Sequence, residues 1–67
     1  MNIILNNTKT EVPEGISTIA ALADWKGVKP QGSAIARNGS VIRKTDWAST
    51  PLHESDTITV ISAAFGG

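Results

Sequence analysis

The residues of this chain with the clearest chemical potential are its last two, Gly66 and Gly67. Glycine has no Cβ, so a terminal carboxylate on such a pair can pass through a channel too narrow for any other residue. The pair follows a predicted strand that ends at residue 62, and five residues at roughly 3.3 Å each can project about 16 Å from a folded body. The spacing therefore indicates a tail whose functional group is its terminal carboxylate. Most terminal glycine pairs, by contrast, belong to disordered tails without a role.

The side chains that usually perform catalysis do not converge in this sequence. His53 stands beside Glu54 and could act as a base or a metal ligand, but it is the only histidine and the chain has no cysteine. We therefore interpret His53 as a surface residue. Asp46, Glu54 and Asp56 lie in predicted turns, and we expect these carboxylates to be solvated. Without a converging nucleophile and base, or a phosphate-binding glycine motif, we expect no enzyme active site, no metal site and no bound cofactor.

Length and charge narrow the class of protein further. A chain of 67 residues forms one small domain. Six Lys and Arg residues balance six Asp and Glu residues, which argues against a nucleic-acid partner. The apolar runs are too short to cross a membrane, and the N-terminus lacks the pattern of a signal peptide, so we expect a cytoplasmic protein.

One surface feature suggests a docking site for a partner. Arg43 and Lys44 come shortly before Trp47, and this basic and aromatic spot could bind an acidic surface of another protein. Trp25 and Trp47 are also the largest apolar groups of a small chain. We expect both chiefly to cover edges of the core.

The apolar pattern predicts the body that carries the tail. Alternation predicts strands at both ends of the chain, Asn38-Gly39 predicts a two-residue hairpin turn, and Ser17 or Thr18 can cap a helix that ends before Gly27. The expected elements are a hairpin of residues 1–5 and 9–12, a helix of residues 18–26, a hairpin of residues 33–37 and 40–42, an irregular or 3₁₀ segment of residues 44–51, and a strand of residues 57–62. Which face of the second hairpin points inward stays open, because both faces carry apolar groups.

This order is the ubiquitin-like β-grasp arrangement of the α+β class. One main helix must cross a mixed sheet of four to five strands to bury its apolar stripe. We place the β-grasp domain at residues 1–62 and a flexible C-terminal tail at residues 63–67.

The chain resembles the ThiS family of sulfur carriers, which are small β-grasp proteins related to ubiquitin and to the small subunit of molybdopterin synthase. The resemblance spans the whole chain, and only its Gly66-Gly67 end is chemically specific. The other matching segments are Met1-Asn2-Ile3-Ile4-Leu5-Asn6, Thr18-Ile19, Asn38-Gly39, Arg43-Lys44-Thr45-Asp46-Trp47, and Asp56 before Ile58. Lys44 stands where the family often has arginine, and Ser55-Asp56 replaces its Gly-Asp turn.

The resemblance implies a mechanism that works through partner enzymes. An E1-like adenylyltransferase would use ATP and Mg²⁺ to adenylate the Gly67 carboxylate, and a sulfur donor enzyme would supply the sulfur of a C-terminal thiocarboxylate. Thiazole synthase would then take this sulfur for thiamin biosynthesis. The carrier would contribute no catalytic side chain, with Ala64, Phe65 and Gly66 as the tail inside the partner's channel and Phe65 at its mouth.

Two alternatives stay open from the sequence. The same carrier chemistry could serve molybdopterin or another thiolation pathway. A non-covalent β-grasp binding module becomes the better interpretation if further residues normally follow Gly67. In either case we expect the chain to be a monomer when it is not bound to a partner.

Overall fold

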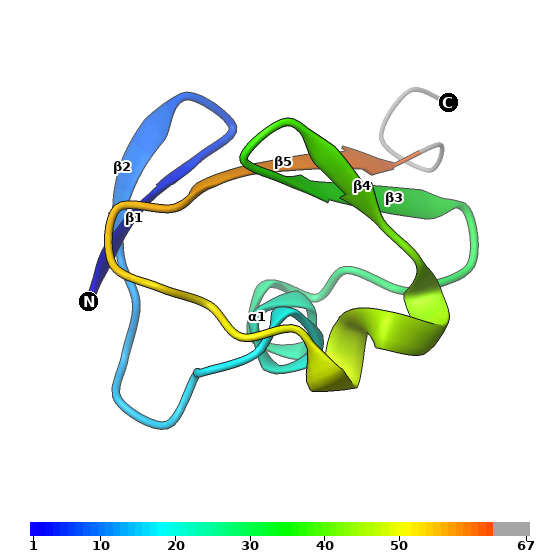
Figure 1. The fold of residues 1–67 in the computed structure, drawn as a ribbon, viewed down its shortest axis with the longest axis horizontal. Coiled ribbons are helices and arrows are strands. Elements are labelled where there is room, and N and C mark those ends of the chain that lie inside the picture. Colours follow the sequence, from blue (N-terminus) through cyan, green and yellow to red (C-terminus); the bar gives the residue numbers. More distant parts are fainter. Residues whose placement is uncertain (63–67) are drawn as a thin grey trace.

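The structure is a computed structural model that describes residues 1–62, and its elements follow the predicted order closely (Figure 1). The strands are β1 (Asn2–Leu5), β2 (Thr8–Glu11), β3 (Ser33–Arg37), β4 (Ser40–Ile42) and β5 (Thr57–Ser62). The helix α1 spans Ile19–Lys26, and a 3₁₀ helix, η1, spans Lys44–Ser49. The predicted flexible tail, residues 63–67, lies outside the described residues.

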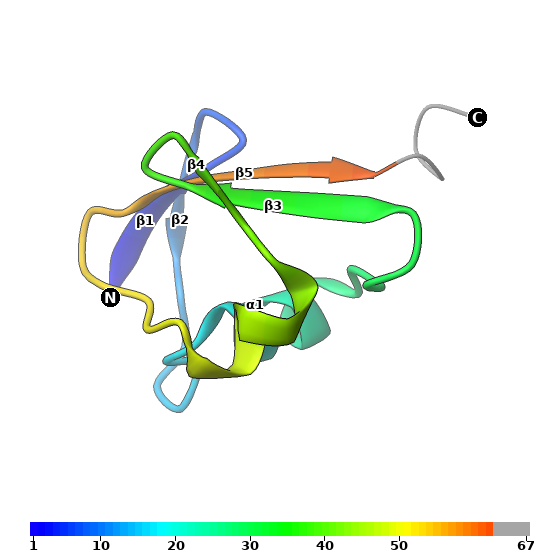
Figure 2. The same ribbon diagram turned by 45° about the vertical axis from the view of Figure 1, so that its right-hand side comes forward.

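The described strands form one mixed five-stranded sheet, which confirms the predicted α+β class. Their order is β2-β1-β5-β3-β4, with β1 parallel to β5 and the other neighbours antiparallel. The two views show α1 and η1 together on one side of this sheet (Figures 1 and 2). The last strand of the chain therefore lies in the middle of the sheet, between the two hairpins.

Local sequence explains where α1 begins and ends. The Thr18 hydroxyl accepts a hydrogen bond from the backbone N–H of Ala21 at 3.1 Å, so Thr18, rather than Ser17, is the N-cap. Gly27 has a φ of 72° and donates its N–H to the last turn, which is the left-handed C-terminal position that favours glycine. The face between these ends buries Ile19 and Leu22 against the sheet.

Both hairpin turns use residues that tolerate positive φ. Asn38 and Gly39 have φ values of 51° and 88°, as a type I′ turn requires. Asn6 and Asn7 have φ values of 48° and 66°, so the first turn also has two residues and β2 begins one residue earlier than predicted.

The burial of its side chains shows which face of the second hairpin points toward the core. Ile35 is completely buried and pairs with Ile42, whereas Val41 is 75% exposed and pairs with Ala36. The predicted pairing is therefore confirmed, and the Ile35 face is the inner one. The buried apolar residues form one cluster: Ile3, Leu5, Val12, Ile19, Leu22, Ala23, Ile35, Trp47, Leu52 and Ile58.

Candidate functional site

The base of the tail is held by the centre of the sheet. Thr57 and Ile58 of β5 pair with β1 on one side, and residues 58–62 of β5 pair with β3 on the other. The last pair is Ser62 with Ser33, whose hydroxyl groups lie 3.3 Å apart. The point from which the last five residues start is thus fixed by strand pairing up to Ser62.

The predicted reactive residues follow this point directly. Gly67 and the tail residues Ala64, Phe65 and Gly66 lie outside the described residues, so their predicted roles stay predictions. The structure places their starting point, Ser62. Five residues can reach at most about 18 Å from it.

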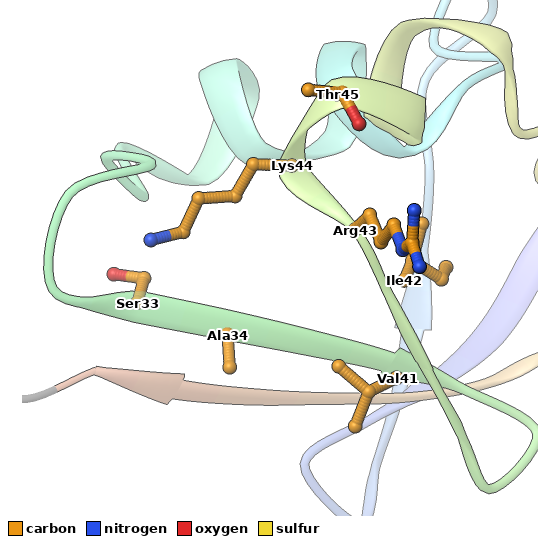
Figure 3. Close-up of a pocket in the computed structure, with 7 residues that line it drawn as sticks. All are labelled: Ser33, Ala34, Val41, Ile42, Arg43, Lys44 and Thr45. Atoms are coloured by element: carbon orange, nitrogen blue, oxygen red, sulfur yellow. The ribbon is translucent and has the colours of Figure 1, made fainter.

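A hollow of about 480 Å³ opens beside this starting point (Figure 3). It lies where the chain leaves β4 and diverges from β3 toward η1, and its lining is mainly apolar. The Lys44 side chain extends across the opening with its amino group toward Ser33, the partner of Ser62 (Figure 3). The lining residues are Ser33, Ala34, Val41, Ile42, Arg43, Lys44 and Thr45.

Apolar side chains continue from this hollow over the outer face of the sheet. Val41 is 75% exposed and Ile61 is 64% exposed, which are high values for residues of this kind. Ile61 pairs with Ala34, and Val41 pairs with Ala36, so these residues alternate with the buried ones and point away from α1. We call Ala34, Ala36, Val41 and Ile61 the outer apolar patch.

The predicted docking spot is only partly at the surface. Arg43 and Lys44 are exposed, but Trp47 is 3% exposed and belongs to the core cluster. Its indole N–H donates to the carbonyl of Ile42 at 3.1 Å. The expectation that Trp47 covers the core is therefore confirmed, because η1 turns the ring inward. The docking of a partner at Arg43, Lys44 and Trp47 stays a prediction.

Trp25 is more exposed than predicted. We expected it to cover the core edge, but it is 38% exposed near the end of α1. The Lys26 amino group lies 4.9 Å from the centre of its ring, within the range of a cation–π contact.

The prediction of a solvated carboxylate is wrong for Asp56. It is 5% exposed, although we expected it to be solvated. It accepts hydrogen bonds from Arg37 Nε at 2.7 Å, from Arg37 Nη2 at 3.3 Å, from Asn38 Nδ2 at 3.1 Å and from the His53 backbone N–H at 2.8 Å. Burial alone would raise the pKa of Asp56, but the hydrogen bonds from Arg37, His53 and Asn38 outweigh it and lower that pKa. This network ties the β3–β4 turn to the start of β5.

His53 lies at the exposed rim of the same network. Its Nδ1 is 3.1 Å from Arg37 Nη2, and the residue is exposed, as predicted. Within residues 1–62, no group of three or more His, Cys, Asp and Glu side chains is arranged to hold a metal ion. In the same range, none of the helices has the length and apolar character needed to span a membrane.

The sequence missed the hollow and the outer apolar patch. The pairing of Val41 with Ala36 was predicted, but the face could not be assigned until β5 was placed beside β3. The sequence nevertheless contained a signal for the outer apolar patch. A hairpin with apolar groups on both faces has one face that the helix cannot cover, and such a face in a small domain indicates a binding surface.

Comparison with known proteins agrees with the fold. The model of the ThiS family matches residues 3–67. Among solved structures, the thiamine biosynthesis protein ThiS from Geobacter metallireducens has a similar fold, with a TM-score of 0.83 and 19% sequence identity. That match covers 92% of this chain and 93% of the other. No curated protein matches the chain significantly.

Proposed function

Because the chain belongs to the ThiS family, we propose that it is a sulfur carrier for thiamin biosynthesis, with Gly67 as its reacting residue. The protein is a substrate of other enzymes and not itself a catalyst. The observation that carries this proposal is the position of β5, a central strand that ends five residues before a Gly-Gly terminus. The sheet thus anchors the start of a segment whose last two residues have no side chains.

Two steps convert the terminal carboxylate. A carboxylate is a poor electrophile, so the activating enzyme first joins a Gly67 oxygen to the α-phosphorus of ATP and releases pyrophosphate. Sulfide delivered by the donor then attacks the acyl carbon and displaces AMP. The product is a C-terminal thiocarboxylate, which keeps one oxygen and gains one sulfur.

Three partners are therefore proposed, each for one part of this cycle. An E1-like adenylyltransferase uses ATP and Mg²⁺, a sulfur donor enzyme supplies the sulfur, and thiazole synthase consumes it. The thiocarboxylate sulfur is nucleophilic and forms the bond to the thiazole precursor. Water then hydrolyses the bond between the acyl carbon and the sulfur, so the sulfur stays on the precursor and the carrier returns as carboxylate. ATP and Mg²⁺ bind the activating partner.

The body of the carrier supplies position. Pairing of β5 with β3 up to Ser62 fixes where the tail starts, and Gly66 and Gly67 add no side chains that a narrow channel would have to admit. Phe65 is the one large apolar residue of the tail, and we propose that it binds at the mouth of the partner's channel, with Ala64 and Gly66 as its neighbours in the part of the tail that the channel holds. Binding contacts of the body then offset the entropy lost when the tail is ordered.

An intact-mass experiment tests the proposal. The chain is incubated with the adenylyltransferase and sulfur donor of the same genome, with MgATP and a sulfide source, and its mass is then measured. We expect the gain of one sulfur in place of one oxygen. The His53→Ala chain should gain the same mass, because His53 has no role in the chemistry, and a chain without Gly67 should not gain it.

The contrary results are equally clear. Sulfur gained by the chain that lacks Gly67 would place the reaction elsewhere. An unchanged mass of the full chain, with an enzyme preparation that is active on its own verified carrier, would reject the carrier function.

A further inference from the structure

The strand β5 continues past the end of its neighbour β1. The pairing of β1 with β5 reaches only Thr57 and Ile58, and the chain then turns back into β2. Residues 59–62 of β5, the part that leads to the tail, have β3 as their one partner among the strands of residues 1–62. A strand that is held along one edge can swing about that edge, so the direction of the tail depends on what holds the other edge.

The side chain of Asn6 holds this other edge. Its Oδ1 accepts a hydrogen bond from the backbone N–H of Val60 at 2.8 Å, and its own backbone N–H donates to the Ile58 carbonyl at 2.9 Å. In a parallel ladder, a residue donates its N–H to the neighbouring strand and accepts through its carbonyl from an N–H two residues further on. Asn6 therefore continues the ladder, with its side-chain oxygen in the place of the backbone carbonyl.

The conformation of the turn also suits asparagine at this position. Asn6 has a φ of 48°, a left-handed conformation that asparagine adopts more readily than most residues. The other hairpin turn makes a similar contact at the start of β5, where Asn38 Oδ1 accepts from the Thr57 N–H at 2.8 Å. The two turns thus fasten β5 near both of its ends, and Asn6 is the contact nearer to the tail.

The position of Val60 connects this contact with the reacting end. Val60 lies two residues before Ser62, from which the tail starts. Residues 63–67 span at most about 18 Å, so a swing of about 10° at Ser62 would move an extended end by about 3 Å. A misplacement of about 1 Å can already cost a hundredfold in rate where two groups must be aligned. The swing must therefore be removed before Gly67 reacts, and a contact that removes it in advance lowers the cost.

We propose that Asn6 is a positioning residue for the reaction at Gly67. It acts through Val60, by fixing the direction in which β5 delivers the tail. This inference rests on the proposed function, because that function makes Gly67 the reacting residue. It goes further by assigning a role in the reaction to a residue of the turn between β1 and β2.

Two glycine substitutions in the same turn test the proposal on the full chain. Asn6→Gly removes the acceptor for Val60, and Asn7→Gly is the matched control. Asn7 has a φ of 66° and is also exposed, and the structure of residues 1–62 gives its side chain no hydrogen bond. Glycine adopts both conformations without strain, so the two changes affect the backbone similarly. Asn6→Asp places a side-chain oxygen back at the same position.

Each variant is measured both as the free chain and in the reaction. Hydrogen exchange and NMR relaxation of the backbone amides report on Val60 and Ser62, and urea unfolding checks that the fold is kept. The KM and kcat of pyrophosphate release are measured with the adenylyltransferase of the same genome and MgATP. The final gain of sulfur is measured by intact mass.

We expect Asn6→Gly to speed the exchange of the Val60 amide and to increase the motion of Ser62. Its kcat should fall about fivefold, the factor that corresponds to the net contribution of one hydrogen bond. Its KM should stay within about twofold, because the swing has to be removed only when the carboxylate meets ATP and the rest of the body is unchanged. Asn7→Gly should keep both constants within about twofold, and Asn6→Asp should recover most of the kcat. All chains should reach the same final gain of sulfur, since Gly67 is intact.

The contrary outcomes separate this role from a structural one and from the proposed function. Equal kcat values for Asn6→Gly and Asn7→Gly would overturn the proposal, and faster exchange at Val60 in Asn6→Gly alone would then show that the contact serves only the fold. A raised KM with unchanged kcat would also overturn it, because Asn6 would then act on docking. The same holds if Asn6→Asp protects Val60 again but keeps the low kcat. In these cases the carrier function stands as long as sulfur is gained, whereas an unchanged chain that gains no sulfur would reject the proposed function together with this role of Asn6.

Discussion

Replacing the buried carboxylate of Asp56 by an amide should destabilise the domain strongly. In Asp56→Asn, the amide oxygen can keep the two shorter hydrogen bonds, from Arg37 Nε at 2.7 Å and from the His53 N–H at 2.8 Å. The amide NH₂ then faces Arg37 Nη2 and Asn38 Nδ2, two donors that the carboxylate accepted at 3.3 Å and 3.1 Å. Two hydrogen bonds to a charged group are lost, each worth about 1.5–3 kcal/mol.

The size of the effect follows from these contacts. Both lost bonds are the longer ones, and the Arg37 side chain is 25% exposed, so water can solvate part of it. We therefore expect the free energy of unfolding to fall by about 3 kcal/mol, at the lower end of that range for two bonds. For a domain of this size, each 1 kcal/mol lowers Tm by roughly 4–8 °C, so Tm should fall by about 12–24 °C.

Urea unfolding followed by tryptophan fluorescence measures this change, because Trp47 is buried in the core. The matched control is Asp24→Asn, the same substitution at an exposed position of α1 for which the structure of residues 1–62 gives no side-chain hydrogen bond. It should change the free energy of unfolding by no more than about 0.5 kcal/mol. If Asp56→Asn were no more destabilising than Asp24→Asn, the network would not stabilise the fold.

Three further predictions follow from particular contacts. The pKa of Asp56 is lower in the folded chain than its ordinary value of 3.8, so its contribution to stability is complete above that pH and is lost as pH falls through the folded pKa. The difference in unfolding free energy between the unchanged chain and Asp56→Asn should therefore be constant above that pH and shrink below it, and a difference that shrinks already near neutral pH would contradict this. Thr18→Ala removes the acceptor for the Ala21 N–H and should cost about 1 kcal/mol in urea unfolding, whereas Thr18→Ser should recover most of it. Gly66→Ala should slow sulfur loading without changing urea unfolding, because its methyl group obstructs a narrow channel, and equal loading rates would reject the channel argument.

Much of the fold could be predicted because its signals are local. Asn38-Gly39 specifies a turn by its tolerance of positive φ, and the turn alone then fixes the pairing of Ile35 with Ile42. Thr18 and Gly27 bound the helix for similarly local reasons. The second strand of the first hairpin was predicted to begin one residue too late, because Asn6, Asn7 and Thr8 are all good turn residues and only two of them are needed.

The features that could not be predicted depend on contacts between distant residues. Asp56 follows a turn and suggested a solvated side chain, but β5 pairs with β3 so that Arg37 lies opposite Ile58, and this register brings the guanidinium to the carboxylate. The outer position of Val41 likewise depends on which face of β3 receives α1. Trp47 was assigned to both the core and a docking surface, and η1 places it in the core. The hollow arises from the path between β4 and η1, which no single segment specifies.

The central claim is that Gly67 carries sulfur from one enzyme to another, and a transfer experiment tests it most directly. The chain is loaded with isotopically heavy sulfur, separated from all loading enzymes and ATP, and mixed with thiazole synthase and its other substrates. The account predicts that heavy sulfur appears in the thiazole product, one atom for each chain consumed, while the chain returns to its original mass. Retention of the heavy sulfur on the chain, or a product made with sulfur of ordinary mass, would contradict it.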